Sequence, residues 1–420
     1  MKANNAAAKR ITRFPTGDIM MPPSKSIVHR ALICAALADG ASVIKNVDLS
    51  DDIRATVQCL QGLGAEIKIS GITAKVLGKS QLLGPDSLTT LNCIESGSTL
   101  RFLLPIAALS RREITFTGQG RLMERPQGAY ADVFAEKGVK FLQGEGKIVV
   151  QGPLPAGEYV LPGNVSSQFV SGLLFALPLV QGNSVITLSS PLESRSYVDM
   201  TQAVMAEFGV KTQQNGQQYI IKGGQSYSAR KYMAEGDWSA AAFFLCAGAL
   251  GREAMCHGLD ENSLQGDKEI LFLLQIMGAG IMSHPDGIFK ALLPEKLRVA
   301  TVDAGNIPDL IPPLATLMCF AQGTSRIVNA ARLRYKESDR LSALATQLNA
   351  LGASVIEEPE GLTIHGKPFI KGGIADACGD HRIAMAAALA AIRCENGVEL
   401  TGWETVAKSY PAFWQDWEGE

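Results

Sequence analysis

Six short polar segments, each directly before a strongly apolar stretch, carry most of the residues that could do chemistry. The first segment, PSKSIVHR, brings Lys25, Ser26 and Arg30 to the start of such a stretch. Backbone N–H groups and the macrodipole at a helix N-terminus attract anions, and basic and hydroxyl side chains strengthen this attraction. A phosphate or carboxylate site is the functional interpretation of the segment, and a solvated basic turn is the alternative.

Recurrence favours the functional interpretation, because the later apolar stretches begin in a similar way. Their first residues include Gly97 and Arg101, then Ser166, Ser167 and Gln168, then Asp237 and Ser239, then Asp309, and finally Asp380, His381 and Arg382. If the apolar stretches are helices that run parallel within a domain, their positive ends converge on one face. Two such faces opposed across a cleft would focus negatively charged ligands.

Further charged side chains lie in the connecting segments. They are Arg121 and Arg125 in RLMERP, Lys336, Glu337 and Arg340 in YKESDR, and Lys408 in AKSYP. The alternative for KESDR is a helix cap formed by Ser338 or Asp339. For Glu337 and Asp309 the alternative to a catalytic role is a surface or capping carboxylate.

A repeated architecture must position these residues. Amphipathic segments that end in glycine recur about every seventy residues, with the glycines at 64, 138, 209, 278 and 352. Nearly all-apolar segments interleave with them, at 29–47, 101–118, 168–188, 241–259, 312–330 and 381–400. An all-apolar helix must be buried all round, whereas an amphipathic helix covers a sheet and its glycine suits a C-terminal cap. The pattern predicts six α/β units; a solenoid is the alternative, although solenoid repeats are usually shorter.

Composition narrows the class of protein. The chain has 420 residues, 46% of them hydrophobic, and its 39 basic and 41 acidic residues give a net charge of −2. A nucleic-acid or anionic-membrane binder usually carries a basic field, so we expect neither partner. The cysteines lie far apart without metal-ligand spacing, which predicts a reduced, cytoplasmic protein without a metal site. No apolar run is long enough for a signal peptide or a membrane span.

Three units per domain is the natural division of six units. The likeliest crossover lies near Gly236, halfway along the chain. We therefore predict one domain at 21–235 and a second formed by 1–20 plus 236–420.

Taken in order, the motifs of the chain resemble those of the EPSP synthase family along nearly the whole length. They are PSKSxxxRA, SDDxR, ERP, SSQF, SYxDM, EGDxSAA, IPD, KESDR, DHRxAM and AKSYP. The resemblance implies an α/β (α+β) fold, a two-domain inverse α/β barrel. Each domain then holds three βαβαββ repeats with buried parallel helices, and the substrate cleft lies between the domains. It also implies a monomer that transfers the enolpyruvyl group of phosphoenolpyruvate to shikimate 3-phosphate.

The resemblance further implies which residues bind each substrate. For shikimate 3-phosphate it implies Lys25, Ser26, Arg30, Ser166, Ser167, Gln168, Ser194, Asp309 and Lys336. For phosphoenolpyruvate it implies Lys25, Gly97, Arg125, Gln168, Arg340, Arg382 and Lys408. Asp309 and Glu337 are then the proton-transfer pair, with Lys25 assisting.

The implied reaction explains this set of residues independently. Both substrates bring a phosphate and a carboxylate, so cations must offset the repulsion among four anionic groups. Addition of a hydroxyl across the enol bond needs a base for the hydroxyl proton and an acid for the methylene carbon. Two carboxylates and a lysine suffice, so we expect neither a metal nor an organic cofactor.

The chain departs from the family pattern in two places, and two rival functions stay open. Residues 95–102 read ESGSTLRF where many members have NAGTAxRP, and Arg332 stands where some members have Asn. The related transferase that acts on UDP-N-acetylglucosamine usually has Lys-Asn in the first motif and a mobile-loop cysteine. This chain has Lys25-Ser26 and no cysteine near MERP. A non-catalytic member of the family is the second rival, and it predicts loss of the charged residues, which are all present.

Overall fold

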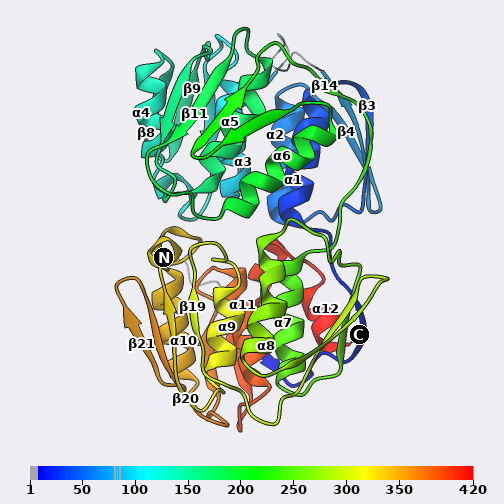
Figure 1. Cartoon of the computed structure of the whole chain (residues 1–420), viewed down its shortest axis with the longest axis vertical. Coiled ribbons are helices and arrows are strands. Elements are labelled where there is room, and N and C mark those ends of the chain that lie inside the picture. The colour runs from blue at the N-terminus through cyan, green and yellow to red at the C-terminus, as the bar shows by residue number, and fades with distance from the viewer. Residues whose placement is uncertain (1–7, 80–81, 83, 85–86, 420) are drawn as a thin grey trace. The chain divides into compact units, whose positions relative to one another are not determined.

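The computed structural model describes residues 8–79, 82, 84 and 87–419, and these form two compact units. One unit is Pro23–Glu235, coloured blue to green in Figure 1. The other combines the described residues up to Pro22 with those from Gly236 onward. The chain therefore enters the second unit, leaves it for the first, and returns.

Two sheets of the unit Pro23–Glu235 have the same topology, in which a buried helix joins two parallel strands and an antiparallel hairpin follows. In chain order, one repeat consists of β6 (Thr90–Asn92), α3 (Gly97–Ala107), β7 (Ile114–Thr117), α4 (Gly128–Glu136), β8 (Lys140–Gly144) and β9 (Lys147–Gln151). The next repeat consists of β10 (Glu158–Leu161), α5 (Ser167–Ala176), β11 (Ser184–Leu188), α6 (Arg195–Glu207), β12 (Thr212–Asn215) and β13 (Gln218–Ile221). This is the βαβαββ order that the family resemblance implies.

The first sheet of this unit takes its opening strand from the end of the unit. Its own elements are α1 (Lys25–Leu37), β3 (Ala38–Lys45), α2 (Asp51–Gly62), β4 (Glu66–Ser70) and β5 (Thr73–Gly78). The short strands β14 (Tyr227–Ser228) and β15 (Lys231–Met233) pair with β3 in parallel. The end of the unit thereby supplies the parallel neighbours of β3.

The second unit follows the same plan in two of its sheets. One holds β2 (Gly17–Met20), α7 (Trp238–Ala249), β16 (Ala254–His257), η3 (Gly266–Glu269), α8 (Ile270–Ile276), β17 (Gly280–His284) and β18 (Ile288–Leu292). The other holds β19 (Thr301–Asp303), α9 (Ile311–Met318), β20 (Gly323–Val328), η4 (Ala331–Tyr335), α10 (Arg340–Ala350), β21 (Val355–Glu358) and β22 (Gly361–Gly366).

The last sheet differs from the rest, because no hairpin of its own follows the second strand. It contains β23 (Gly373–Asp376), α11 (His381–Ala391) and β24 (Val398–Thr401), followed by η5 (Trp403–Lys408) and α12 (Phe413–Glu418). The strand β1 (Lys9–Ile11) pairs with β24 instead. Lys9 Nζ lies 2.9 Å from Glu418 Oε1 and over the rings of Trp403 and Trp414, at 5.5 and 5.0 Å from their centroids.

Glycines end the outer helices, as the repeat predicts. All five recurring glycines have positive φ, namely Gly64, Gly138, Gly209, Gly278 and Gly352. An L side chain rarely adopts such a φ, so glycine ends the helix without strain.

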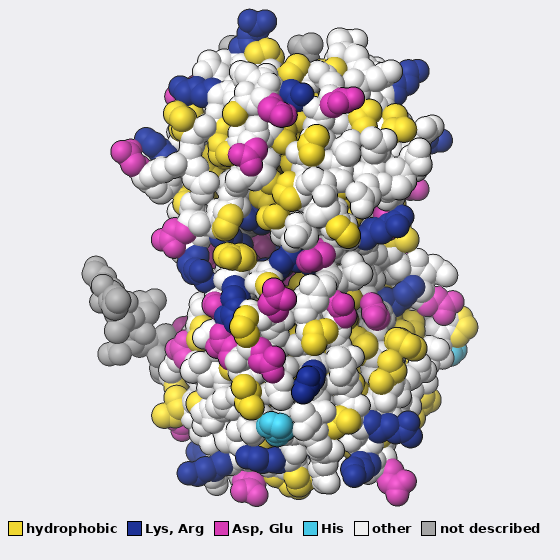
Figure 2. Space-filling model, turned by 60° about the vertical axis from the view of Figure 1, so that its left-hand side comes forward, with side chains coloured by type: hydrophobic (Ala, Val, Ile, Leu, Met, Phe, Trp, Pro, Cys, Tyr) yellow, Lys and Arg dark blue, Asp and Glu magenta, His cyan; other side chains and the backbone are white. Residues whose placement is uncertain are grey.

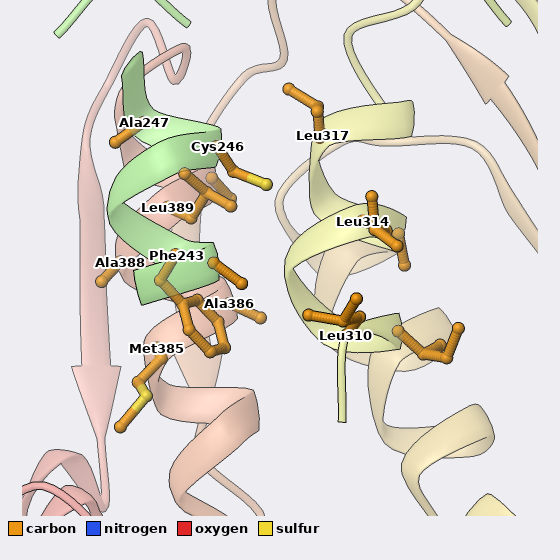
Figure 3. Close-up of a cluster of buried hydrophobic side chains, with 14 of the residues drawn as sticks. Phe243, Cys246, Ala247, Leu310, Leu314, Leu317, Met385, Ala386, Ala388 and Leu389 are labelled. Carbon is orange, nitrogen blue, oxygen red and sulfur yellow. The ribbon is translucent and has the colours of Figure 1, made fainter. Parts of the chain in front are cut away.

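The all-apolar helices form the cores. In Figure 3, Phe243 and Cys246 of α7, Leu314 of α9 and Leu389 of α11 lie in one cluster of buried side chains. The order of the labelled residues shows that α7, α9 and α11 run in the same direction. Their N-termini, which carry the polar segments, therefore lie at one end of this unit.

On the face of the molecule that Figure 2 draws, Lys and Arg side chains are interspersed with Asp and Glu. Within the described part of the chain, no helix is both long and apolar enough to cross a bilayer.

Candidate active site

Lys25 is the first residue of α1 and forms an ion pair with a residue that sequence reasoning missed. Its Nζ lies 2.7 Å from Oδ2 of Asp52, in the first turn of α2. The Lys25 side chain keeps 18% of its surface exposed and Asp52 keeps 7%. Ser26, the next residue of α1, is half-buried. Lys25 is therefore held by a neighbouring carboxylate, with part of its side chain still exposed.

Arg30 is turned inward, toward α6. Its guanidinium donates to Thr201 Oγ1 at 2.9 Å and to the carbonyl oxygens of Tyr197 and Ser26 at 2.8 and 2.7 Å. Burial lowers the pKa of Arg30 to about 10. The structure thus gives Arg30 a role in joining α1 to α6, and its contact with a substrate stays a prediction.

Three predicted residues meet at the N-terminus of α3. A Cβ atom on Gly97 would lie 3.1 Å from Nη1 of Arg125 and 3.7 Å from Oε1 of Gln168. Gln168 donates to Ser98 Oγ at 3.0 Å and accepts from Arg101 Nη1 at 2.8 Å. Two guanidinium groups and a helix N-terminus thus surround a position without a side chain, which is suitable for an anion.

The remaining predicted residues of this unit lie beside α5 and α6. Ser166 caps α5 by accepting from the Gln168 N–H at 3.3 Å, and Ser167 is the first, buried residue of that helix. Ser194 precedes α6 in a left-handed conformation with φ 55° and is buried. A non-glycine residue with positive φ is uncommon and often marks a functional position.

The second unit contains a buried arginine enclosed by three carboxylates. Arg340 Nε donates to Asp380 Oδ2 at 2.8 Å, Nη1 to Asp309 Oδ1 at 2.9 Å, and Nη2 to Glu337 Oε2 at 2.9 Å. The exposed fraction of the Arg340 side chain is 2%. Burial alone would raise the pKa of Asp380, but the Arg340 guanidinium holds it below its usual value. Arg340 is thus permanently charged and fixes two of the predicted catalytic residues relative to each other.

Asp309 is shared by three cations. Besides Arg340, it contacts Arg382, whose Nη2 lies 3.1 Å from Oδ2 and whose Nη1 donates to the Asp309 carbonyl at 3.0 Å. Lys336 Nζ lies 3.9 Å from Oδ1. The Asp309 side chain keeps 19% of its surface exposed, so it remains accessible despite these contacts.

Lys336 has an unusual pKa. Burial lowers the pKa of Lys336 to about 8. The nearby charge of Asp309 raises this pKa, and that of Arg340 lowers it further. The Lys336 side chain nevertheless keeps 32% of its surface exposed. Lys408, at the end of η5, is buried.

Asp267 is a buried carboxyl near this cluster that sequence reasoning did not single out. It lies in η3 and accepts a hydrogen bond from the Ser239 hydroxyl, at the start of α7. Burial, with Asp309 as a second cause, raises the pKa of Asp267 to about 7. The sequence signal that could have found it is the QGD segment, where an acidic residue enters a helix turn.

The structure therefore brings most of the predicted residues together within their own units. Asp309, Lys336, Glu337, Arg340 and Arg382 form one cluster, and Gly97, Arg125 and Gln168 form another. Among the described residues, no three His, Cys, Asp or Glu side chains are grouped so that they could hold a metal ion.

One unit thus groups two guanidinium groups at a helix N-terminus, and the other groups three carboxylates around a buried arginine. The family model for EPSP synthase (3-phosphoshikimate 1-carboxyvinyltransferase) matches residues 11–417. The chain belongs to the EPSP synthase family.

Relatives and solved structures agree with this membership. Proteins named 3-phosphoshikimate 1-carboxyvinyltransferase from Clostridium kluyveri and Clostridium acetobutylicum are each 46% identical, over 95% of this chain and 94% of the relative. EPSP synthase from Acinetobacter baumannii has a TM-score of 0.79 at 24% identity, over 98% of this chain and 96% of that one. The enolpyruvyl transferase NikO from Streptomyces tendae has a TM-score of 0.77 at 18% identity, over 98% and 97%. The two structures share the fold with this chain.

Proposed function

We propose that this protein transfers the enolpyruvyl group of phosphoenolpyruvate to the 5-hydroxyl of shikimate 3-phosphate, releasing phosphate. The observation that carries the proposal is the Arg340 cluster, in which one guanidinium holds Asp309 and Glu337 at 2.9 Å each. Family membership and the names of relatives at 42–46% identity support the choice of substrates.

The carboxylate pair suits the two proton transfers of an addition–elimination. In the addition, one group takes the hydroxyl proton while the oxygen bonds to the central carbon of the enol, and another protonates the methylene carbon. In the elimination, the new methyl group loses a proton and phosphate leaves. We assign Asp309 and Glu337 to these steps, with Lys25 assisting, and no cofactor is part of the scheme.

The cations suit the anionic groups of the substrates. We assign the phosphoenolpyruvate phosphate and carboxylate to Lys25, the Gly97 turn, Arg125, Gln168, Arg340, Arg382 and Lys408. We assign shikimate 3-phosphate to Lys25, Ser26, Arg30, Ser166, Ser167, Gln168, Ser194, Asp309 and Lys336. Arginine binds phosphate and carboxylate through two parallel hydrogen bonds, which fixes orientation as well as charge.

A monomeric, cytoplasmic enzyme is part of the proposal. All eight cysteines are free thiols, which supports a reducing compartment. The net charge of −2, from 39 basic and 41 acidic residues, gives no reason to expect a nucleic acid or membrane partner.

Phosphate release by the purified protein tests the proposal. Phosphoenolpyruvate is supplied with either shikimate 3-phosphate or UDP-N-acetylglucosamine as acceptor. Release with shikimate 3-phosphate alone is expected. Release with the sugar nucleotide alone would assign the chain to the rival transferase, and release with neither acceptor would favour a non-catalytic member of the family.

A further inference from the structure

A buried polar network crosses three helices of the unit Pro23–Glu235. On α1, Lys25 and His29 are one helical turn apart and share a face, and on α2 the same holds for Asp52 and Thr56. The two faces meet in two contacts. Lys25 Nζ lies 2.7 Å from Asp52 Oδ2, and His29 Nδ1 lies 2.7 Å from Thr56 Oγ1.

The inner contact continues to the N-terminus of α3. Thr56 Oγ1 lies 2.6 Å from Thr99 Oγ1, and the Thr99 hydroxyl donates to Ser96 Oγ at 2.8 Å. The Ser96 oxygen also accepts from the Thr99 N–H at 3.2 Å and so caps α3 directly before Gly97. His29, Thr56, Thr99 and Ser96 have no exposed surface. Water therefore cannot replace a lost partner without rearrangement.

Each hydroxyl has a single hydrogen, and this fixes the direction of the chain. The Thr99 hydrogen points to Ser96, with the Asp52 carbonyl at 3.5 Å as its other acceptor, so Thr56 must donate to Thr99. The Thr56 oxygen is then left to accept from His29, whose Nδ1 must carry a hydrogen.

We propose that the hydrogen-bonded chain His29–Thr56–Thr99–Ser96 holds the Gly97 turn at a fixed position relative to Lys25. The inference rests on the proposed function, because both ends of the network are candidate binding residues for phosphoenolpyruvate. Lys25 is a candidate for both substrates, whereas Gly97 is a candidate for phosphoenolpyruvate alone. Loss of the chain releases the Gly97 turn but leaves the Lys25–Asp52 ion pair in place, so it affects the donor substrate more than the acceptor.

Thr56→Val and Thr56→Ser form the matched pair that tests this proposal. Valine keeps the shape and removes the hydroxyl, whereas serine keeps the hydroxyl. We expect Thr56→Val to raise KM for phosphoenolpyruvate about tenfold or more, as for the loss of a buried hydrogen bond. KM for shikimate 3-phosphate should change less than about threefold, and Thr56→Ser should restore the donor KM. A normal donor KM in Thr56→Val, whatever its melting temperature, would overturn the proposal.

Two measurements cover the case in which Thr56→Val does not fold. Ser96→Ala removes the last acceptor at the cost of a helix cap, and the same donor-selective rise in KM is expected. An unchanged donor KM in this variant would also overturn the proposal.

The second measurement does not need turnover. Ring ¹⁵N shifts of the wild-type protein, with His29→Asn assigning the signal among five histidines, should show hydrogen on Nδ1 of His29. A bare Nδ1 would contradict the chain. Absence of wild-type turnover, by contrast, would contradict the proposed function. The spectroscopic result would then decide whether the hydrogen-bond chain exists.

Discussion

Asp380 and Arg340 form an ion pair at 2.8 Å that is almost completely shielded from water, with 0% and 2% of the two side chains exposed. Asp380 also caps α11 by accepting from the Arg382 N–H at 3.0 Å. One carboxylate thus fixes both the arginine that holds the catalytic candidates and the start of the helix that carries Arg382.

Asp380→Asn should destabilise the protein strongly. The variant keeps the shape but removes the charge opposite a buried guanidinium, and we expect the free energy of unfolding to fall by about 3 kcal/mol. Urea unfolding measures this loss. Glu399→Gln, an exposed carboxylate on β24, is the control and should change stability by less than about 0.5 kcal/mol. Equal losses in the two variants would contradict the role of the buried pair.

Asp309→Asn and Glu337→Gln should each reduce turnover by about two to four orders of magnitude if these groups transfer protons. Steady-state phosphate release measures the effect, with the exposed Glu360→Gln as a control that keeps normal turnover. Near-normal turnover in both variants would remove these residues from the catalytic step.

Asp267→Asn should change how stability depends on pH. The folded protein raises the pKa of Asp267 to about 7, from an unfolded value of about 3.9. The protonated group therefore contributes stability that is complete below pH 4 and is lost as the pH rises through 7. The variant lacks this loss, so its melting temperature relative to wild type should be higher at pH 8 than at pH 5. The same difference at both pH values would show that Asp267 does not titrate there.

Binding of shikimate 3-phosphate should be linked to proton uptake at alkaline pH. Because the pKa of Lys336 is about 8, much of this group is neutral at pH 8.5, and a bound anion would restore its charge. Calorimetry in two buffers of different ionisation enthalpy measures the uptake. Lys336→Met should lose it, and an unchanged uptake in that variant would assign the proton to another group.

Lys9→Met should loosen the segment that carries Lys408. Lys9 contacts Glu418 and the rings of Trp403 and Trp414, and methionine keeps most of the aliphatic stem. We expect a loss of about 1 kcal/mol in unfolding free energy. Arg10→Met, at an exposed position on the same strand, is the matched control. A similar loss in the control would attribute the effect to the strand and not to the Lys9 contacts.

Much of the fold could be predicted, because the repeat appears directly in the sequence. All-apolar helices must be buried, and glycine after each outer helix marks its end, so the six-unit plan follows from residue types. The missing hairpin of the last sheet could not be predicted, since β1 takes its place from the other end of the chain. No local pattern near β24 shows that partner.

The sequence indicated which residues belong to the candidate site, but it indicated few of the contacts between their side chains. Polar segments before apolar helices drew attention to Lys25, Gly97 and Arg382. Residue types alone could not show that Lys25 pairs with Asp52, or that Arg30 bonds to neutral oxygens of α6. The cluster around Arg340 combines three segments that are distant in sequence, which carry Asp309, Glu337 with Arg340, and Asp380. Such contacts follow from tertiary packing.

The interrupted layout of the second unit has a consequence for the order in which the protein folds on the ribosome. The strands β1 and β2 are made first, but their partners β24 and β16 are made after the whole of Pro23–Glu235. That segment contains every strand of its own three sheets. Domains generally fold as units, N-terminal first, during synthesis. The inserted unit can therefore reach its native state before the partners of β1 and β2 have been synthesised.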